Sequence, residues 1–105
     1  MSKHTPGPWF VTGNMTLYVE ARIGGGLVQE VAAVGPTEAD SGYGPQQRAN
    51  ADLLAAAPEL LEALEATNML LRTKRHACEI TEVCHVLDTH IKRNQAAIAK
   101  ARGEA

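Results

Sequence analysis

The sequence predicts an α+β fold in which a three-stranded antiparallel sheet is followed by two to three helices, packed as a helical hairpin on one face of the sheet. Two observations lead to this prediction. Alternating apolar and polar residues with glycine turns fill the first third of the chain, and a leucine- and alanine-rich pattern of helical period fills the second half. A length of 105 residues suits one domain. We expect residues 1–35 to form a β-meander, 36–46 a loop and 47–102 the helical part.

Three stretches predict strands, at residues 10–12, 15–23 and 27–34. The middle stretch alternates as a strand with one buried face does, and its apolar set is Leu17, Val19, Ala21 and Ile23. The run Gly24–Gly26 separates the second and third stretches. It leads into a strand instead of opening a helix, so it indicates a hairpin tip and not a phosphate-binding loop.

The run from Arg48 to Leu64 is the most apolar and most helix-prone part of the chain, because Ala, Leu and Glu favour helix. Pro58 interrupts it, since proline lacks an amide donor and disfavours helical geometry at the preceding residue. We expect one helix over residues 46–56 and a second over 58–71, with a kink or a break between them. The leucines of this run are expected to form the core that covers the sheet.

A last helix is predicted over residues 77–101. Residues of a helix–helix seam recur in steps of four and three, and they are Ile80, Cys84, Leu87, Ile91, Asn94, Ile98 and Ala101. All are apolar except Asn94, which could set the register or the oligomeric state. The preceding helix offers a matching seam at Ala57, Leu61, Leu64, Asn68 and Leu71. A hairpin within one chain would satisfy both seams. A homodimer through the long C-terminal helix would satisfy one of them, so both arrangements stay open.

Composition narrows the classes of function. A net charge of −2 and an aromatic content of 4% argue against a dedicated nucleic-acid binder, which usually carries a strongly basic surface. No apolar run is long enough for a membrane span, and the first residues lack the apolar centre of a signal peptide. We expect a cytoplasmic protein whose two cysteines are free thiols.

A catalytic or metal site is not expected. His76, Cys78, Cys84, His85 and His90 lie near one another in the sequence, but on a single helix their spacing does not place them on one face three or four residues apart. No Gly-x-Ser-x-Gly elbow occurs. The sequence therefore predicts neither an enzyme nor a resident metal or cofactor.

Candidate binding residues come from loops and charged ends. Tyr43 lies between glycines in the 36–46 loop, and a basic cluster closes the second helix at Arg72, Lys74, Arg75 and His76. Aromatic and basic side chains of this kind recur at protein interfaces. An alternative site for a phosphate-bearing ligand would use Trp9, Arg22 and Arg48, which supply a stacking ring and two guanidinium groups.

Two motifs carry a resemblance to known proteins. His4-Thr-Pro-Gly-Pro-Trp9 and Ala49-Asn-Ala-Asp-Leu-Leu-Ala-Ala-Ala-Pro-Glu-Leu-Leu-Glu-Ala-Leu64 resemble those of a widespread group of small bacteriophage and prophage accessory proteins, and residues 96–105 are similar as well. The resemblance implies a phage origin and a site of action in the host cytoplasm. It implies no catalytic residue.

These observations lead to three hypotheses. The first is a non-enzymatic phage protein that binds and inhibits a host factor, such as a component of CRISPR interference. The second is a sponge that sequesters a nucleotide second messenger at a subunit interface. A small nucleic-acid-binding regulator is the third, and the charge of the chain favours it least.

Overall fold

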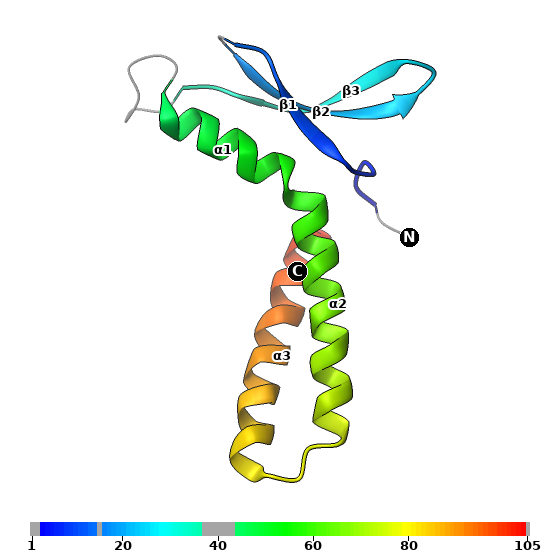
Figure 1. The fold of residues 1–105 in the computed structure, drawn as a ribbon, viewed down its shortest axis with the longest axis vertical. Coiled ribbons are helices and arrows are strands. Elements are labelled where there is room, and N and C mark those ends of the chain that lie inside the picture. The colour runs from blue at the N-terminus through cyan, green and yellow to red at the C-terminus, as the bar shows by residue number, and fades with distance from the viewer. Residues whose placement is uncertain (1–2, 15, 37–43, 105) are drawn as a thin grey trace. The chain divides into compact units, whose positions relative to one another are not determined.

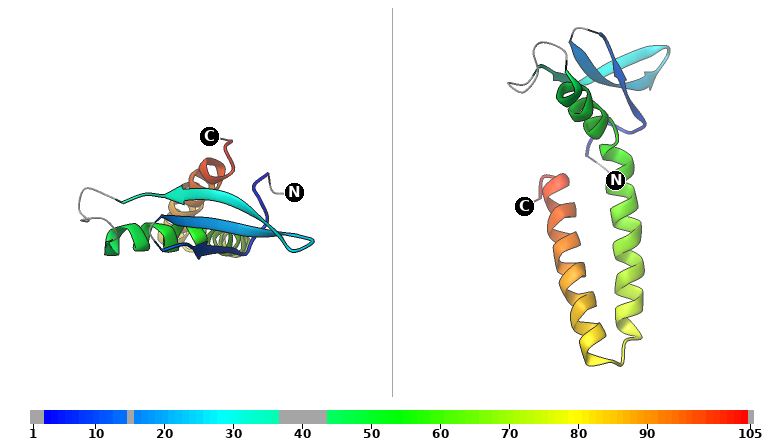
Figure 2. Two further views of the ribbon diagram at one scale, coloured as in Figure 1. Left: turned by 90° about the horizontal axis from the view of Figure 1, so that it is seen from above. Right: turned by 60° about the vertical axis from the view of Figure 1, so that its left-hand side comes forward.

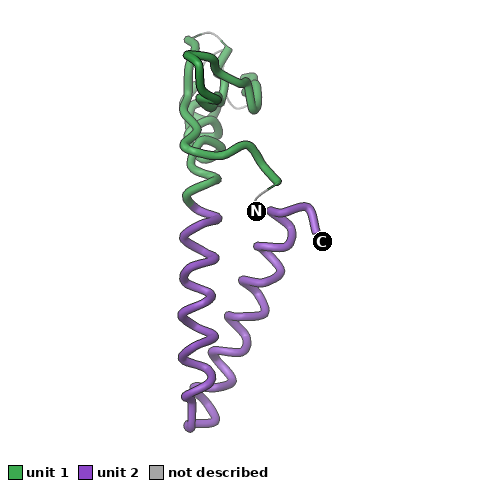
Figure 3. The backbone as a smooth tube through the Cα atoms, turned by 90° about the vertical axis from the view of Figure 1, so that its right-hand side faces the viewer, with its two compact units in different colours: residues 1–59 green, residues 60–105 purple. Residues whose placement is uncertain are grey.

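The computed structural model describes residues 3–14, 16–36 and 44–104. The elements follow in the order β1 (Trp9–Thr12), β2 (Leu17–Gly24), β3 (Leu27–Val34), α1 (Pro45–Ala55), α2 (Ala57–His76) and α3 (Thr81–Ala101) (Figure 1). The predicted α+β class, with a three-stranded antiparallel sheet followed by three helices, is confirmed. The chain divides into two compact units, residues 1–59 and 60–105, which Figure 3 distinguishes by colour. Whether they behave as the single domain we expected stays a prediction.

The sheet has the strand order β1-β2-β3, with β2 in the centre and both neighbours antiparallel to it. The predicted alternation along β2 is confirmed for Leu17, Val19 and Ala21, which are all buried. It is wrong for Ile23, which is 54% exposed. The reason is the length of the neighbouring strand, since β1 pairs with β2 only as far as Ala21.

Helix α1 covers one face of the sheet. Ala51 and the central Val19 are both 0% exposed, and Leu17 and Val34 complete this core at 7% each. Small side chains at Ala51 and Ala55 stand four residues apart on the same face of the helix, which lets the helix lie close to the strands.

The expectation that the leucines of residues 48–64 form this core is wrong for Leu53, Leu54 and Leu60. Their exposed fractions are 64%, 42% and 53%. Leu53 follows Ala51 by two positions, about 200° around the helix, which carries its side chain away from the buried contact with the sheet. Leu54 follows by three positions and lies at the margin of the buried face.

Gln47 ties α1 to the end of β3. Its side chain is 1% exposed, and Nε2 donates a hydrogen bond of 2.7 Å to the carbonyl oxygen of Val34. Trp9 anchors the start of the chain: its ring packs against the core, and Nε1 donates to the carbonyl oxygen of Thr5 at 3.0 Å.

Ala56 belongs to neither helix and forms a turn with φ −83° and ψ −5°, so α1 and α2 are separate helices. Pro58 is the second residue of α2, where the missing amide donor costs no helical hydrogen bond. The second helix continues to His76 instead of ending at residue 71 as expected. The basic side chains of its last turn, Lys74, Arg75 and His76, favour this continuation because cations complement the negative end of the helix dipole.

Helices α2 and α3 run side by side in opposite directions in Figures 1 and 2, so the predicted hairpin within one chain is confirmed. The two predicted seams meet: Ile91 and Asn68 are 9% and 5% exposed. Most of the remaining apolar seam side chains are only half-buried, among them Leu61, Leu64, Leu71, Leu87 and Ile98. The prediction is wrong for Ile80, which precedes α3 and is 62% exposed. Two helices alone cannot cover the side chains between them from both sides, so these side chains stay partly exposed.

The expected start of the last helix and the expected state of the two cysteines are both wrong. Helix α3 begins at Thr81 instead of residue 77, and Cys78 and Cys84 form a disulfide instead of free thiols. The physical reason is that residues 77–80 are not helical. The chain therefore turns before α3 and brings Cys78 back beside the first turn of that helix, with a Cα–Cα distance of 5.7 Å.

Replacing Gln47 with alanine should lower the free energy of unfolding by about 1–3 kcal/mol, because the carbonyl group of Val34 would lose its hydrogen bond in a buried position. Urea unfolding followed by circular dichroism measures this change. Asn50→Ala, at an exposed position of the same helix, is the control and should change stability little. Equal effects of the two substitutions would contradict the role assigned to Gln47.

Replacing Asn68 with leucine should stabilise the hairpin by about 1–3 kcal/mol, because the buried Oδ1 of Asn68 has no hydrogen-bond partner among the described residues. Thermal unfolding of the variant checks this. Gln95→Leu places the same side chain at an exposed position of α3 and should change the melting temperature much less. A destabilised Asn68→Leu variant would show that the amide has a stabilising role in the seam.

Candidate functional site

The tip of the β2–β3 hairpin is the candidate binding surface of the sheet. Gly25 and Gly26 have φ angles of 61° and 76°, the left-handed geometry that glycine adopts in a tight two-residue turn. Ile23, Leu27 and Val28 flank this turn and are 54%, 63% and 51% exposed. We call Arg22, Ile23, Leu27 and Val28 the hairpin tip. It is an apolar surface held by a rigid pair of strands.

The tip is exposed because β2 and β3 extend beyond the part of the sheet that α1 covers. β2 and β3 each have eight residues, whereas β1 has four. The buried cluster lies toward the other end of these strands, around the pair Leu17 and Val34. The glycine turn was predicted from the sequence, but the exposure of the three apolar residues beside it was not. A comparison of the predicted strand lengths would have indicated this exposure, because the first strand is too short to reach the glycine turn.

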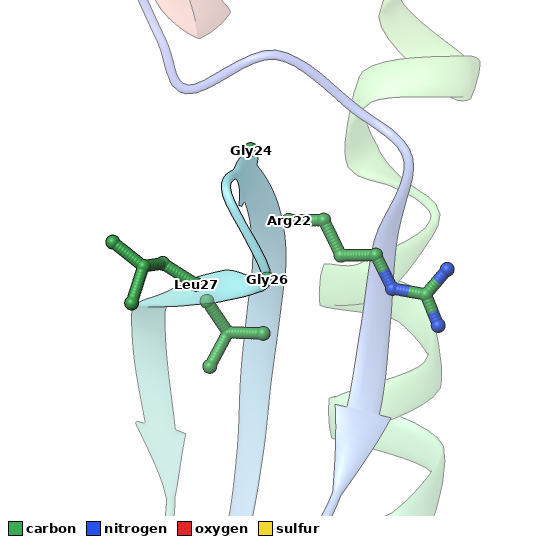
Figure 4. A pocket seen from close by; sticks show the side chains of 5 residues that line it. Arg22, Gly24, Gly26 and Leu27 are labelled. Carbon is green, nitrogen blue, oxygen red and sulfur yellow. The ribbon is translucent and has the colours of Figure 1, made fainter.

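A shallow hollow of about 190 Å³ lies at the tip and is lined by Arg22, Gly24, Gly26, Leu27 and Val28 (Figure 4). Pockets that enclose a drug-sized ligand usually hold about 300–1,000 Å³. The guanidinium carbon of Arg22 stands 5.4 Å from the centre of the Phe10 ring, close enough for a cation–π contact. Figure 4 shows this side chain directed away from Leu27, toward β1. The hollow is therefore smaller than a usual ligand pocket.

The alternative ligand site does not come together within one chain. Trp9 pairs with the buried Ala21 and packs against the core, whereas Arg22 follows Ala21 and points to the opposite face of the sheet. Arg48 lies on α1 and forms an ion pair of 3.1 Å with Asp52. A nucleotide site that uses these three residues would need further groups from another subunit, and this hypothesis stays a prediction.

The basic cluster is spread around the end of α2. Arg75 points into the hairpin, where Nε donates to Oδ1 of Asp88 at 2.8 Å, and Arg72, Lys74 and His76 are exposed. Lys74 and His76 precede and follow Arg75 and so lie on different sides of the helix. The four residues do not form one patch, and Arg75 is engaged within the hairpin. Tyr43, the other predicted contact, lies outside the described residues.

The side chain of Asp88 has a lowered pKa. Its hydrogen bond from Arg75 holds the pKa of the carboxyl group below the ordinary value of 3.8, and the positive charge of Arg75 acts in the same direction. Across the described residues, no group of three or more His, Cys, Asp or Glu side chains is arranged to hold a metal ion. The helices of the described residues include none with the length and apolar character needed to cross a membrane.

Comparison with known proteins gives one positive finding. A model of the family described as Salmonella phage P22 protein Y8K6 matches residues 1–105. A search of curated proteins and a search of solved structures give no match.

The pair Arg75–Asp88 makes the stability of the hairpin depend on pH. A carboxyl group whose pKa is lowered by folding contributes its full stabilisation above its unfolded-state pKa, and loses it as the pH falls through the folded-state pKa. Asp88→Asn should therefore lower the melting temperature at pH 7 and reduce its fall below pH 3.8. Melting curves from neutral to acid pH measure both effects. Glu104→Gln, beyond the end of α3, is the control and should leave the profile unchanged; an unchanged profile for Asp88→Asn would contradict the assignment.

Proposed function

Because the chain belongs to the Salmonella phage P22 protein Y8K6 family, we propose that this phage accessory protein is not an enzyme and acts by binding and inhibiting a protein of the bacterial host. The observation that carries the proposal is the exposed apolar hairpin tip, which no element of the described chain covers. Large exposed side chains gathered at one place mark protein interaction surfaces. The bacterial cytoplasm is where such a phage protein would meet its target.

The tip continues into a free sheet edge. β3 is the last strand in the order β1-β2-β3, and no further strand pairs with it within the described residues. Such an edge presents unpaired backbone groups to an extended peptide, and pockets for alternate side chains supply specificity. We infer that an extended segment of the target adds to β3, with an apolar side chain at the tip.

The kind of target that we propose is a component of host defence, such as a CRISPR interference protein. The phage family supports this choice, since a phage gains when a host defence protein is blocked. The size of the hollow supports a protein partner over a sequestered nucleotide.

Leu27→Glu should weaken capture of the target from host lysate at least about tenfold, or about 1.4 kcal/mol, because it places a charge in the apolar contact. Quantitative pull-down with the tagged full chain measures this. Leu53→Glu is the matched control, since Leu53 on α1 is 64% exposed and Leu27 is 63% exposed. The control should capture as much target as the wild type.

No captured host protein, or equal losses for the two variants, would overturn the proposal. A plasmid-interference assay tests the CRISPR component separately. Expression of the wild-type chain in a host with active CRISPR immunity should raise the recovery of a targeted plasmid, and Leu27→Glu should not. If a host protein is captured but plasmid recovery does not rise, the proposal of a host-protein inhibitor stands and a CRISPR component is excluded as the target.

A further inference from the structure

The disulfide between Cys78 and Cys84 lies at the closed end of the helical hairpin, where the chain turns from α2 into α3. Its Cα–Cα distance is 5.7 Å, and it joins residues that are six apart in the sequence. Cys78 comes two residues before Ile80, the cap residue of α3, and Cys84 is the fourth residue of that helix. An apolar contact across a helix start commonly fixes the direction in which the chain enters the helix. Here a covalent bond occupies this place.

The turn itself lacks the residues that usually reverse a chain between two helices. Its sequence is Ala77-Cys-Glu-Ile80, and no glycine or proline occurs between Pro58 and Gly103. Glycine, proline, asparagine and aspartate are the residues that favour turns. Ile80 has no side-chain oxygen, so it cannot accept a hydrogen bond from the first amide groups of α3 as a usual cap residue does. The turn therefore depends more strongly on the disulfide than on local conformational preference.

A second link at this end of the hairpin is weaker. Arg75 and Asp88 form an ion pair of 2.8 Å, and their side chains are 40% and 45% exposed. Arg75 is three residues before Cys78 and Asp88 is four residues after Cys84, so the ion pair and the disulfide are successive links between the same two helix ends. A partly exposed ion pair usually contributes little stability. Cleavage of the disulfide would therefore remove the stronger of these two links.

The disulfide is accessible to small reductants from solvent. Both cysteines are half-buried, and the five residues between them are all exposed. Ile80 and Val83, which belong to this segment, are 62% and 47% exposed. Disulfides at exposed positions are the labile and regulatory ones, whereas structural disulfides resist reduction. The position of this disulfide is therefore typical of a labile one.

The surrounding charges also bear on its cleavage. Lys74 and His76 lie in the last turn of α2, and Cys84 lies near the start of α3, where the helix dipole is positive. Nearby cations and helix starts stabilise a thiolate, and a stabilised thiolate leaves faster in thiol–disulfide exchange. Glu79 and Glu82 act in the opposite direction. The two helix ends thus favour cleavage, and the two glutamates moderate this effect.

We propose that the disulfide between Cys78 and Cys84 is a reversible redox switch that controls the order of the hairpin turn. In the oxidised state the turn is held and α3 begins at Thr81. In the reduced state residues 77–84 lose this fixed structure, while the rest of the hairpin stays folded. Disulfides in a reducing cytoplasm are usually transient or redox-sensing, and this step rests on the bacterial cytoplasm of the proposed function.

The reductant is a thiol of the glutathione class. One thiolate attacks a sulfur of the disulfide, forms a mixed disulfide and releases the other cysteine as a thiolate, which takes up a proton. A second thiolate attacks the mixed disulfide and releases the remaining cysteine in the same way. Two electrons and two protons pass to the protein, and the two reductant molecules become one disulfide. Oxidised glutathione reverses each step.

Equilibration of the purified full chain with mixtures of reduced and oxidised glutathione, followed by thiol alkylation and mass spectrometry, measures the reduced fraction. The pair should be mostly reduced in excess reduced glutathione and mostly oxidised in excess oxidised glutathione. A disulfide that persists in about a hundredfold excess of reduced glutathione would be structural and would overturn the proposal. Thiols that stay reduced in a similar excess of oxidised glutathione would overturn it as well.

Amide hydrogen exchange tests the structural effect of the switch. Reduction should raise the exchange rate of residues 77–88 by about tenfold or more, because the link that orders the turn is lost. Strand β2 is the internal control and should exchange equally in both states. The double variant with Cys78→Ser and Cys84→Ser should exchange like the reduced wild type in either buffer, which excludes a direct effect of the reductant.

Equal exchange of residues 77–88 in the oxidised and reduced wild type would overturn the control of the turn by the disulfide. Neither measurement involves a host protein. A negative result here would therefore leave the hairpin tip as the proposed binding surface, and failure of target capture would leave the redox switch.

Discussion

The close contact of α1 with the central strand is the interaction on which the first unit of the chain depends. Ala51 and Val19 are both fully buried, and the small alanine lets the helix lie near the sheet. A three-stranded sheet needs such a cover, because it cannot bury an apolar face alone. Gln47 fixes the position of α1 relative to the end of β3, because its side chain donates a hydrogen bond to the carbonyl oxygen of Val34. The buried Nε2 donor of its amide is satisfied by this bond, and an unsatisfied donor in that position would be costly.

The limited reach of this contact explains the candidate site. One helix of eleven residues covers the part of the sheet around Leu17 and Val34, and the strands continue past it to Gly24 and Leu27. Apolar residues beyond the cover therefore stay exposed. The second unit also exposes apolar residues, but for another reason. Its two helices bury only the side chains between them and leave their other faces exposed. In a chain of 105 residues the buried fraction is modest, and the remaining apolar surface is available to partners.

Periodicity in the sequence predicted which residues share a face, and this part of the fold could be read directly. The alternation along β2 and the two helix seams are local patterns that the structure retains. Periodicity does not indicate how much of the sheet a helix covers. Ile23 and Leu53 were therefore assigned to the core, although both are exposed. The disulfide was missed for a similar reason, since the pairing of Cys78 with Cys84 depends on a chain reversal before α3 that no repeat signals. The glycine turn marked the position of the candidate site, but the exposure of Leu27 and Val28 follows from the shortness of β1.

The two surplus apolar surfaces differ in how they are built. Within the described residues, the hairpin tip joins apolar side chains to a free strand edge, which presents unpaired backbone groups to an extended segment. A helix satisfies its backbone groups internally, so the exposed apolar side chains of α2 and α3, among them Leu70 and Val86, can offer only side-chain contacts. A substitution at the tip and a substitution on the helices would therefore change binding by different routes.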